Sequence, residues 1–246
     1  MLSKTQNKYI RSLTQQKYRK EHNVFIAEGD KIAKEWLNSG YKIQLIVALE
    51  EWLQENSAFV ASHPEATVLD VKDWELEAVS TLQTSNQVLL VVSMPKKCDM
   101  SNSSGWSIAL DGIQDPGNMG TIIRIADWFG IQHIVCSPDC VDVYNPKVVQ
   151  SAMGGHLRVQ IQEMNLQEFI SKAKLPIFAA TLGGTDVYTL PKRSSGILVI
   201  GNESIGVSQA IIQKATYKVT IPRRGGAESL NAAVSTGILC AMLLPC

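Results

Sequence analysis

Short runs of hydrophobic residues alternate along the chain with segments of helical periodicity. In the first 95 residues the runs predict strands at NVFIAEG, KIQLIVAL, TVLDV and NQVLLVVSM. The segments between them predict helices at DKIAKEWLNSG, EEWLQENSAF and VKDWELEAVS. Alternating strands and helices favour a layered α/β domain with a mostly parallel sheet.

A second α/β pattern fills the rest of the chain. Its predicted strands are WSIALD, IQHIVCS, LRVQIQ, IFAAT, GILVIG and YKVTIP. Helices are expected at 119–129, 145–153, 165–174 and 208–215, and a last one at SLNAAVSTGILCAMLL. Near-continuous apolar strands indicate a sheet that is covered on both faces. A polar stretch without periodicity separates the two patterns, so we expect a domain at 1–95, a linker at 96–105 and a domain at 106–246.

Composition fits a globular protein. The chain has 246 residues, of which 45% are hydrophobic and 19% charged. No apolar run reaches the roughly 18 residues of a membrane-spanning helix, and the first residues lack the apolar segment of a secretory signal. A mitochondrial presequence is the alternative interpretation of the basic start, but a folded pattern follows it directly. We therefore expect a cytoplasmic protein.

Cysteine and histidine spacing does not predict a metal site. The five cysteines are scattered and include no C-x-x-C pair, which fits reduced thiols. The one cluster is His133, Cys136 and Cys140, and it has no second pair of ligands to complete a zinc site. We expect His133 and Cys136 to belong to a strand.

Charge is uneven although the net charge is zero. The first 20 residues contain no acid and six basic residues, Lys4, Lys8, Arg11, Lys17, Arg19 and Lys20. Tyr9 and Tyr18 lie among them. Such a segment can track phosphates and stack on bases, or it can be a solvated amphipathic helix, which is the simpler interpretation.

Three loops that follow predicted strands carry the unusual chemistry: GIQDPGNMG, GNESIGVS and PRRGGAESLN. Ligands bind outside the carboxyl ends of strands in such sheets. The dinucleotide fingerprint G-x-G-x-x-G, a P-loop and the nucleophile elbow G-x-S-x-G are all absent. A site built from these loops would have to use Arg, Asn, Ser, Glu and backbone amides.

Arg124 is the first candidate residue. On a helical wheel it shares a side with Gly120 and Asp127, opposite the apolar residues that should pack on the sheet. An i,i+3 pair with Asp127 would explain it as a surface charge. Alternatively, Asn118 could cap the helix and Gly120 could leave space for a ligand, so that the helix start and the guanidinium suit a phosphate or ribose.

The other two loops offer a carboxylate and an amide. Glu203 stands in an uncharged segment between Gly201 and Gly206, although a plain turn would also explain the loop. In the third loop Ser229 could cap the last helix, with Asn231 in its first turn. That helix is apolar on more than one face, which indicates full burial or a subunit interface.

Together these segments resemble the signature of the SpoU/TrmH branch of the SPOUT RNA methyltransferases. The first motif matches at Asn118, Gly120, Arg124 and Ala126. The second matches at Gly201, Asn202, Glu203, Gly206 and Ser208, and the third at Ile221, Pro222, Ser229, Leu230 and Asn231. Ser204 departs from the glycine that the family commonly has. FIAEGDKIAKEWL resembles the start of the small substrate-binding domain that often precedes this catalytic domain.

The resemblance implies a parallel sheet with a C-terminal trefoil knot, a rare exception to unknotted topology. It implies S-adenosylmethionine as cofactor, held by Thr181, Leu182, Gly183, Ile200, Gly201, Asn202, Glu203, Gly206, Ile221, Pro222, Ser229, Leu230 and Asn231. It also implies a homodimer with the last helix in the interface.

The implied reaction is methylation of a ribose 2′-hydroxyl, in ribosomal RNA first and transfer RNA second. The resemblance gives the catalytic role to Arg124, with Asn118, Glu203, Ser229 and Asn231 orienting the groups, and no metal is needed. Because a guanidinium stays protonated, we expect Arg124 to stabilise charge rather than act as a base. A base-modifying knotted methyltransferase and a non-catalytic RNA-binding module are the alternatives.

Overall fold

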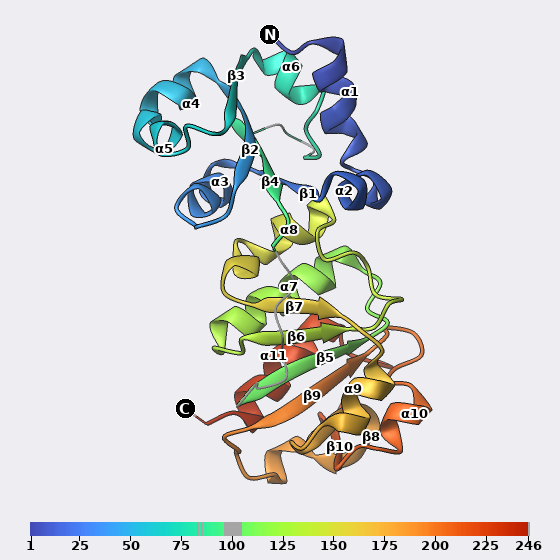
Figure 1. The fold of residues 1–246 in the computed structure, drawn as a ribbon. Helices are drawn as coiled ribbons and strands as arrows, with labels where there is room; N and C mark the ends of the chain where they lie inside the picture. Colours follow the sequence, from blue (N-terminus) through green and yellow to red (C-terminus); the bar gives the residue numbers. More distant parts are fainter. Residues whose placement is uncertain (83, 85, 96–104, 246) are drawn as a thin grey trace. The chain divides into compact units, whose positions relative to one another are not determined.

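The protein forms two compact units in a computed structural model that describes residues 1–82, 84, 86–95 and 105–245 (Figure 1). One unit contains Met1–Lys96 and Asp142–Leu157, and the other contains Lys97–Val141 and Arg158–Cys246. The segment Asp142–Leu157, inside the span predicted for the second domain, therefore clusters with the first unit. Of the predicted linker 96–105, residues 96–104 lie outside the described residues.

The first unit is built on a four-stranded sheet in the order β1-β4-β2-β3. Its strands are β1 (Val24–Glu28), β2 (Ile43–Leu49), β3 (Thr67–Val71) and β4 (Val88–Ser93). The strand positions confirm the prediction, but the expected mostly parallel sheet is wrong. Only β2 and β3 run parallel, because β4 enters between β1 and β2 and runs antiparallel to both. Hydrophobic periodicity reports which residues are buried and not the direction of a strand.

Helices cover both faces of this sheet. Its helices are α1 (Lys4–Ser12), α2 (Gln16–His22), α3 (Asp30–Leu37), α4 (Glu50–Glu55), α5 (Ser57–Ala61), α6 (Asp73–Glu77) and α8 (Pro146–Ala152), with a 3₁₀ turn η1 (Gly155–Leu157). Alternate strand residues serve the two cores: Phe25 packs with Trp36 of α3 and Val149 of α8, whereas Ile26 packs with Ile10 of α1. The period of two along each strand thus produces a two-sided core.

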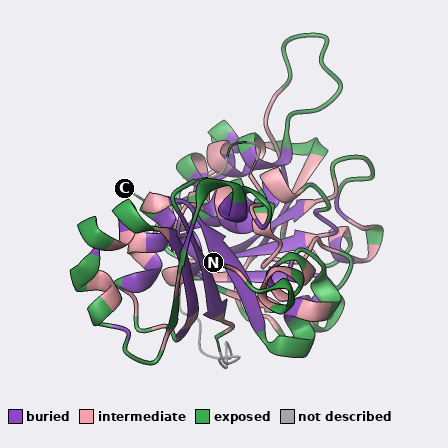
Figure 2. Cartoon of the chain, turned by 90° about the horizontal axis from the view of Figure 1, so that it is seen from above, coloured by how far each residue is buried: buried purple, intermediate pink, exposed green. Residues whose placement is uncertain are grey.

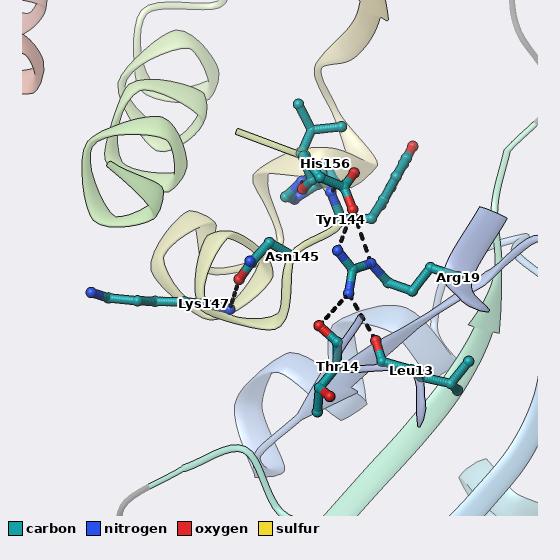
Figure 3. A network of polar contacts seen from close by, with 9 residues as sticks. Leu13, Thr14, Arg19, Tyr144, Asn145, Lys147 and His156 are labelled. Carbon is teal, nitrogen blue, oxygen red and sulfur yellow. Dashed lines mark hydrogen bonds and ion pairs between the residues drawn. The ribbon is translucent and has the colours of Figure 1, made fainter. Parts of the chain in front are cut away.

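The buried Arg19 fixes the segment 142–157 to the start of the chain (Figure 3). Its side chain is 1% exposed, and it donates to the backbone oxygens of Leu13 and Thr14, both at 2.8 Å. It also pairs with the carboxylate of Asp142, with Nε 2.9 Å from Oδ2. Beside it, the ring of Tyr144 stacks on Phe25 at a centroid distance of 4.8 Å. All three nitrogens of the Arg19 guanidinium therefore donate hydrogen bonds inside the fold.

The second unit is a six-stranded sheet in the order β10-β8-β9-β5-β6-β7, with every pair parallel. The predicted parallel sheet is confirmed here. Its strands are β5 (Trp106–Asp111), β6 (His133–Cys136), β7 (Gln160–Glu163), β8 (Ile177–Asp186), β9 (Gly196–Gly201) and β10 (Tyr217–Thr220). His133 and Cys136 belong to a strand, as expected, and β8 extends five residues beyond its predicted end at Thr181.

The central strands are buried between layers of helices (Figure 2). The helices are α7 (Pro116–Trp128), α9 (Leu166–Lys172), α10 (Gln209–Ile212) and α11 (Ala232–Leu243), with a 3₁₀ turn η2 (Val187–Thr189). Helices α9 and α10 share one core with β8 and β9, while α7 and α11 pack against each other. No described helix is long and apolar enough to cross a membrane.

We predict that Arg19→Ala lowers the free energy of unfolding by about 3–5 kcal/mol, because it leaves Asp142 Oδ2 and two backbone oxygens without their donor. Arg19→Lys should recover only part of this loss, since an ammonium lacks the planar fork. Urea denaturation measures the change. Arg11→Ala, at an exposed arginine, is the control and should change stability by less than about 0.5 kcal/mol. Equal effects at the two positions would contradict the anchoring role of Arg19.

Candidate active site

The loops of interest converge at one edge of the six-stranded sheet. Because all six strands are parallel, the loops after β5, β8, β9 and β10 leave from the same edge. Strands β5 and β9 are neighbours, with Asp111 beside Gly201. The chain moves outward from β5 through β6 and β7 and returns on the other side through β8 and β9. This reversal of strand order is where ligands bind in open α/β sheets.

The loop after β5 turns into α7 at Asp115. The carboxylate of Asp115 accepts the backbone N–H of Asn118 at 2.7 Å, and Pro116 occupies the first helical position. The expected cap by Asn118 is therefore wrong, and α7 begins three residues earlier than predicted. The earlier start places Asn118 in the first turn of the helix, where its side chain is free to reach the other loops.

The loop after β9 is a tight turn built around Asn202. Its Nδ2 donates to the oxygen of Gly112 at 2.7 Å, and its Oδ1 accepts the N–H groups of Ser204 and Ile205 at 2.9 and 3.2 Å. A side chain at Gly201 would place its Cβ 2.1 Å from the backbone carbon of Gly206. Only glycine at 201 therefore allows the loop to fold back on its strand.

Two further residues hold the first two loops in place, and the sequence patterns did not single them out. Asp111, the last residue of β5, accepts the N–H of Ser208 through Oδ2 at 2.7 Å. Ser137, directly after β6, accepts the N–H of Gly112 at 2.9 Å. The sequence feature that could have indicated Asp111 and Ser137 is a polar residue at the end of an apolar strand.

The third loop ends at the N-cap of α11, which is Asn231. Its Oδ1 accepts the N–H groups of Ala233 and Val234 at 3.0 and 3.2 Å. The sequence analysis expected Ser229 as the cap and Asn231 within the first turn, and both expectations are wrong. Ser229 and Leu230 lie exposed before the helix. The capping geometry gives the amide of Asn231 a fixed orientation, with its Nδ2 directed away from the helix.

A chain of side-chain hydrogen bonds joins the three loops. Asn231 Nδ2 donates to Asn118 Oδ1 at 2.7 Å, and Asn118 Nδ2 donates to Glu203 Oε1 at 2.8 Å. Because the helix amides occupy Asn231 Oδ1, the direction of donation is set along the whole chain. Asn118 is 9% exposed. Three candidate residues from distant parts of the sequence are thus brought together, and the last acceptor is a carboxylate.

Arg124 projects from α7 as an exposed side chain, two turns beyond the helix start. The alternative of an i,i+3 pair with Asp127 is wrong. The carboxylate of Asp127 instead accepts Arg158 Nε at 2.8 and 3.0 Å. Within the described part of the chain, Arg124 makes no hydrogen bond or ion pair. Its guanidinium is therefore available to an anion.

The ends of β8 and β10 form the remaining part of the candidate site. Thr220 Oγ1 donates to the oxygen of Leu182 at 3.3 Å, which links the predicted cofactor segment 181–183 to the residues just before Ile221 and Pro222. Large apolar side chains stand exposed here: Leu182 in β8 is 82% exposed, Ile205 in the loop after β9 is 83% exposed, and Leu230 in the loop after β10 is 50% exposed. These side chains offer apolar surface to a ligand bound at this edge of the sheet.

Cys140 lies close to the first loop, and its thiol donates to the oxygen of Leu110 at 3.3 Å. Hydrogen bonds from Cys136 and Ser137 lower the pKa of the Cys140 thiol to about 7, against the opposing effect of burial. The pKa of Cys136 moves well upward, because it is the donor of that pair and is buried. No group of three or more possible His, Cys, Asp or Glu ligands to a metal is found among the described residues.

Comparisons with known proteins identify the family of this chain. Residues 105–241 match the profile of the SpoU rRNA Methylase family. The chain belongs to that family. Residues 4–90 match the MRM3-like substrate binding domain, so the matches cover both units of this SpoU-family chain. The resemblance stated from the three motifs is confirmed.

Three proteins are similar to this SpoU-family chain over nearly its whole length. The 23S rRNA (guanosine(2553)-2′-O)-methyltransferase of Bacillus subtilis is 29% identical and aligns with 93% of this chain and 92% of its own. A TrmH-family protein structure from Porphyromonas gingivalis is 34% identical, with a TM-score of 0.86 over 99% and 98% of the two chains. An rRNA methyltransferase from Sinorhizobium meliloti, solved with AdoMet bound, is 29% identical, with a TM-score of 0.87 over 98% and 95%.

Two substitutions separate the two tasks of Asn231. Asn231→Ser should keep the helix cap but is too short to reach Asn118, whereas Asn231→Ala loses both. We expect the alanine variant to be less stable than the serine variant by about 1 kcal/mol, the usual contribution of an N-cap. Urea denaturation of both variants and the wild type measures this difference. Equal stability of the two variants would show that Asn231 does not cap α11.

Proposed function

We propose that this protein is an S-adenosylmethionine-dependent methyltransferase of ribosomal RNA that acts on a ribose 2′-hydroxyl. One observation carries the proposal: the Asn231–Asn118–Glu203 chain joins three loops at the first turn of α7, the helix that also carries the exposed, unpaired Arg124. Membership of the SpoU family supports the reaction class. The Bacillus subtilis relative, a 23S rRNA 2′-O-methyltransferase over nearly its whole length, supports ribosomal RNA before transfer RNA.

The candidate site suits S-adenosylmethionine. Leu182, Ile205 and Leu230 offer apolar surface to an adenine ring, and the backbone at 181–183, 200–206, 221–222 and 229–231 offers donors and acceptors to its edges. The AdoMet-bound relative from Sinorhizobium meliloti supports the same assignment. When bound, this cofactor supplies an electrophilic methyl group on a sulfonium, a chemistry that requires no metal.

Arg124 takes the charge-stabilising role in this proposal. A ribose hydroxyl is a weak nucleophile, and negative charge develops on its oxygen as it attacks. A guanidinium stays protonated in proteins, so Arg124 serves as a donor to that oxygen or to the adjacent phosphate and not as a base. No other side chain competes for it among the described residues, so no ion pair has to break before substrate binds.

Asn118, Glu203 and Asn231 are assigned to positioning. Asn118 is buried, and both ends of its amide are bonded, so it holds the carboxylate of Glu203 in one place. A fixed carboxylate can orient a ribose hydroxyl or Arg124 and can attract the sulfonium charge. Ser229 is exposed two residues before Asn231 and is assigned to the same candidate site as a hydroxyl contact.

The finer features implied by the resemblance complete the proposal. Residues 1–95, with which the segment 142–157 clusters, act as an RNA substrate-binding domain, and the rest of 106–246 acts as the methyltransferase domain. The loops after β8, β9 and β10 belong to a trefoil knot, as the resemblance implies. An experimental tracing of this backbone tests the knot. The protein acts in the cytoplasm, which cell fractionation tests.

The proposal also includes a homodimer through α11. Val234, Ile238 and Ala241 recur at i, i+4 and i+7 on this helix, and none of them is fully buried in the single chain. Val234 is 51% exposed. An apolar helical stripe of this kind favours a partner helix. Sedimentation velocity tests it, since a sedimentation coefficient for a single chain would contradict the dimer.

Incubation of unmodified rRNA and tRNA with the protein and methyl-labelled cofactor tests the activity. Ribose methylation blocks alkaline cleavage, so we expect labelled, alkali-resistant linkages in rRNA. Arg124→Ala should abolish this labelling while calorimetry still detects cofactor binding, because the arginine acts on the substrate. Labelled base with normal alkaline cleavage would favour the base-modifying alternative. Failure to bind S-adenosylmethionine would favour the non-catalytic one.

A further inference from the structure

Helix α1 presents a basic surface hollow on the first unit. The hollow is lined by Leu2, Lys4, Asn7, Lys8 and Arg11, and we call it the α1 basic hollow. At about 100° per residue, Lys4, Lys8 and Arg11 fall on one side of the helix, opposite the buried Ile10. With a rise of 1.5 Å per residue, the three cations form a row about 10 Å long. The packing of α1 on the sheet therefore directs this row outward.

The three cations of the hollow are not neutralised by the fold. In the described part of the chain, Lys4, Lys8 and Arg11 have exposed side chains without an ion pair. One acidic residue, Glu75, is hydrogen-bonded to a residue that lines the hollow, and it is only 2% exposed. Its carboxylate accepts the N–H groups of Lys72 at 3.1 Å and Leu2 at 2.6 Å. Glu75 is thus committed to backbone amides, and positive charge prevails at the surface.

The aromatic residues of the same segment point elsewhere. Tyr9 and Tyr18 pack against the core formed by α1, α6 and the sheet. The ring of Tyr9 meets His22 edge-on at 5.1 Å, and its burial raises the pKa of the Tyr9 phenol. These rings are therefore not free to stack on bases. What remains exposed is a row of cations alone, which suits contacts to phosphate groups and does not read sequence.

We propose that the α1 basic hollow binds backbone phosphates of the RNA substrate. The occupant is RNA because the row offers several cations without an apolar platform, and a polyanion with regularly spaced charges complements it. This inference rests on the proposed function for the identity of the RNA. In this proposal α1 contributes affinity for RNA that is independent of the RNA sequence, and the candidate active site carries out the methyl transfer.

The test compares two triple variants. Lys4→Gln/Lys8→Gln/Arg11→Gln removes the row while keeping good helix formers. Lys20→Gln/Lys31→Gln/Lys42→Gln removes three exposed lysines of the same unit that do not line the hollow, and it is the matched control. Filter binding to 23S rRNA transcribed in vitro is measured for each protein over a series of salt concentrations. Thermal melting verifies that both variants fold.

For the α1 variant we expect the slope of log K against log salt to fall by about 2, roughly 0.7–0.9 per phosphate contact. Binding at about 0.1 M salt should weaken roughly tenfold or more. In methyl transfer KM should rise and kcat should stay unchanged, whereas the control variant should match the wild type. An unchanged slope, or an equal fall in both variants, would overturn the proposal. Lost binding to anionic vesicles with intact RNA binding would assign the hollow to a membrane instead.

The two proposals fail separately. If the wild type binds rRNA with the expected salt dependence but transfers no methyl group, the hollow stands and the proposed activity fails. If methyl transfer occurs with unchanged KM in the α1 variant, the activity stands and the hollow fails. Arg124→Ala provides the complementary control, since it should lose turnover while the salt slope falls by no more than about one phosphate contact, roughly 0.7–0.9.

Discussion

The candidate site depends on one constraint, the direction of donation through Asn231 and Asn118 to Glu203. The N-terminal amides of α11 occupy the oxygen of Asn231, so its amide nitrogen must donate onward. Asn118 then presents its own nitrogen to Glu203. The group at the end of the chain must therefore accept a hydrogen bond, and an ionised carboxylate such as Glu203 can only accept. A helix cap therefore determines the position of a carboxylate contributed by another loop.

The parallel sheet makes this constraint possible. It delivers the loops after β5, β9 and β10 to one edge, and Gly201 and Asn202 draw the second loop back onto the first. Arg124 makes no bond to this network, and Asp127, one turn along α7, pairs with Arg158 instead. The site thus combines a hydrogen-bonded part, the Asn231–Asn118–Glu203 chain, with an exposed guanidinium at Arg124 that has no partner among the described residues. Rigid acceptors and an available guanidinium suit a reaction in which charge appears only in the transition state.

Sequence patterns predicted most of the elements and the identity of the clustered residues, but not how those residues connect. Strands such as GILVIG could be found because apolar runs bounded by glycine have few other interpretations. The antiparallel β4 could not, because burial carries no direction. The caps by Asp115 and Asn231 were missed because several polar residues precede each helix and only the backbone path selects among them. Similarly, no local pattern could show that 142–157 pack into the first unit through Arg19.

A double-mutant cycle at Asn118 and Glu203 tests the central constraint most directly. Asn118→Asp places a carboxylate against Glu203 and should destabilise the protein. Adding Glu203→Gln restores a donor facing that carboxylate, with the polarity of the bond reversed. Urea unfolding of the four proteins should then show a favourable coupling of at least about 0.5 kcal/mol between the two changes. Strictly additive effects would contradict the account, because they would mean that Asn118 does not position Glu203.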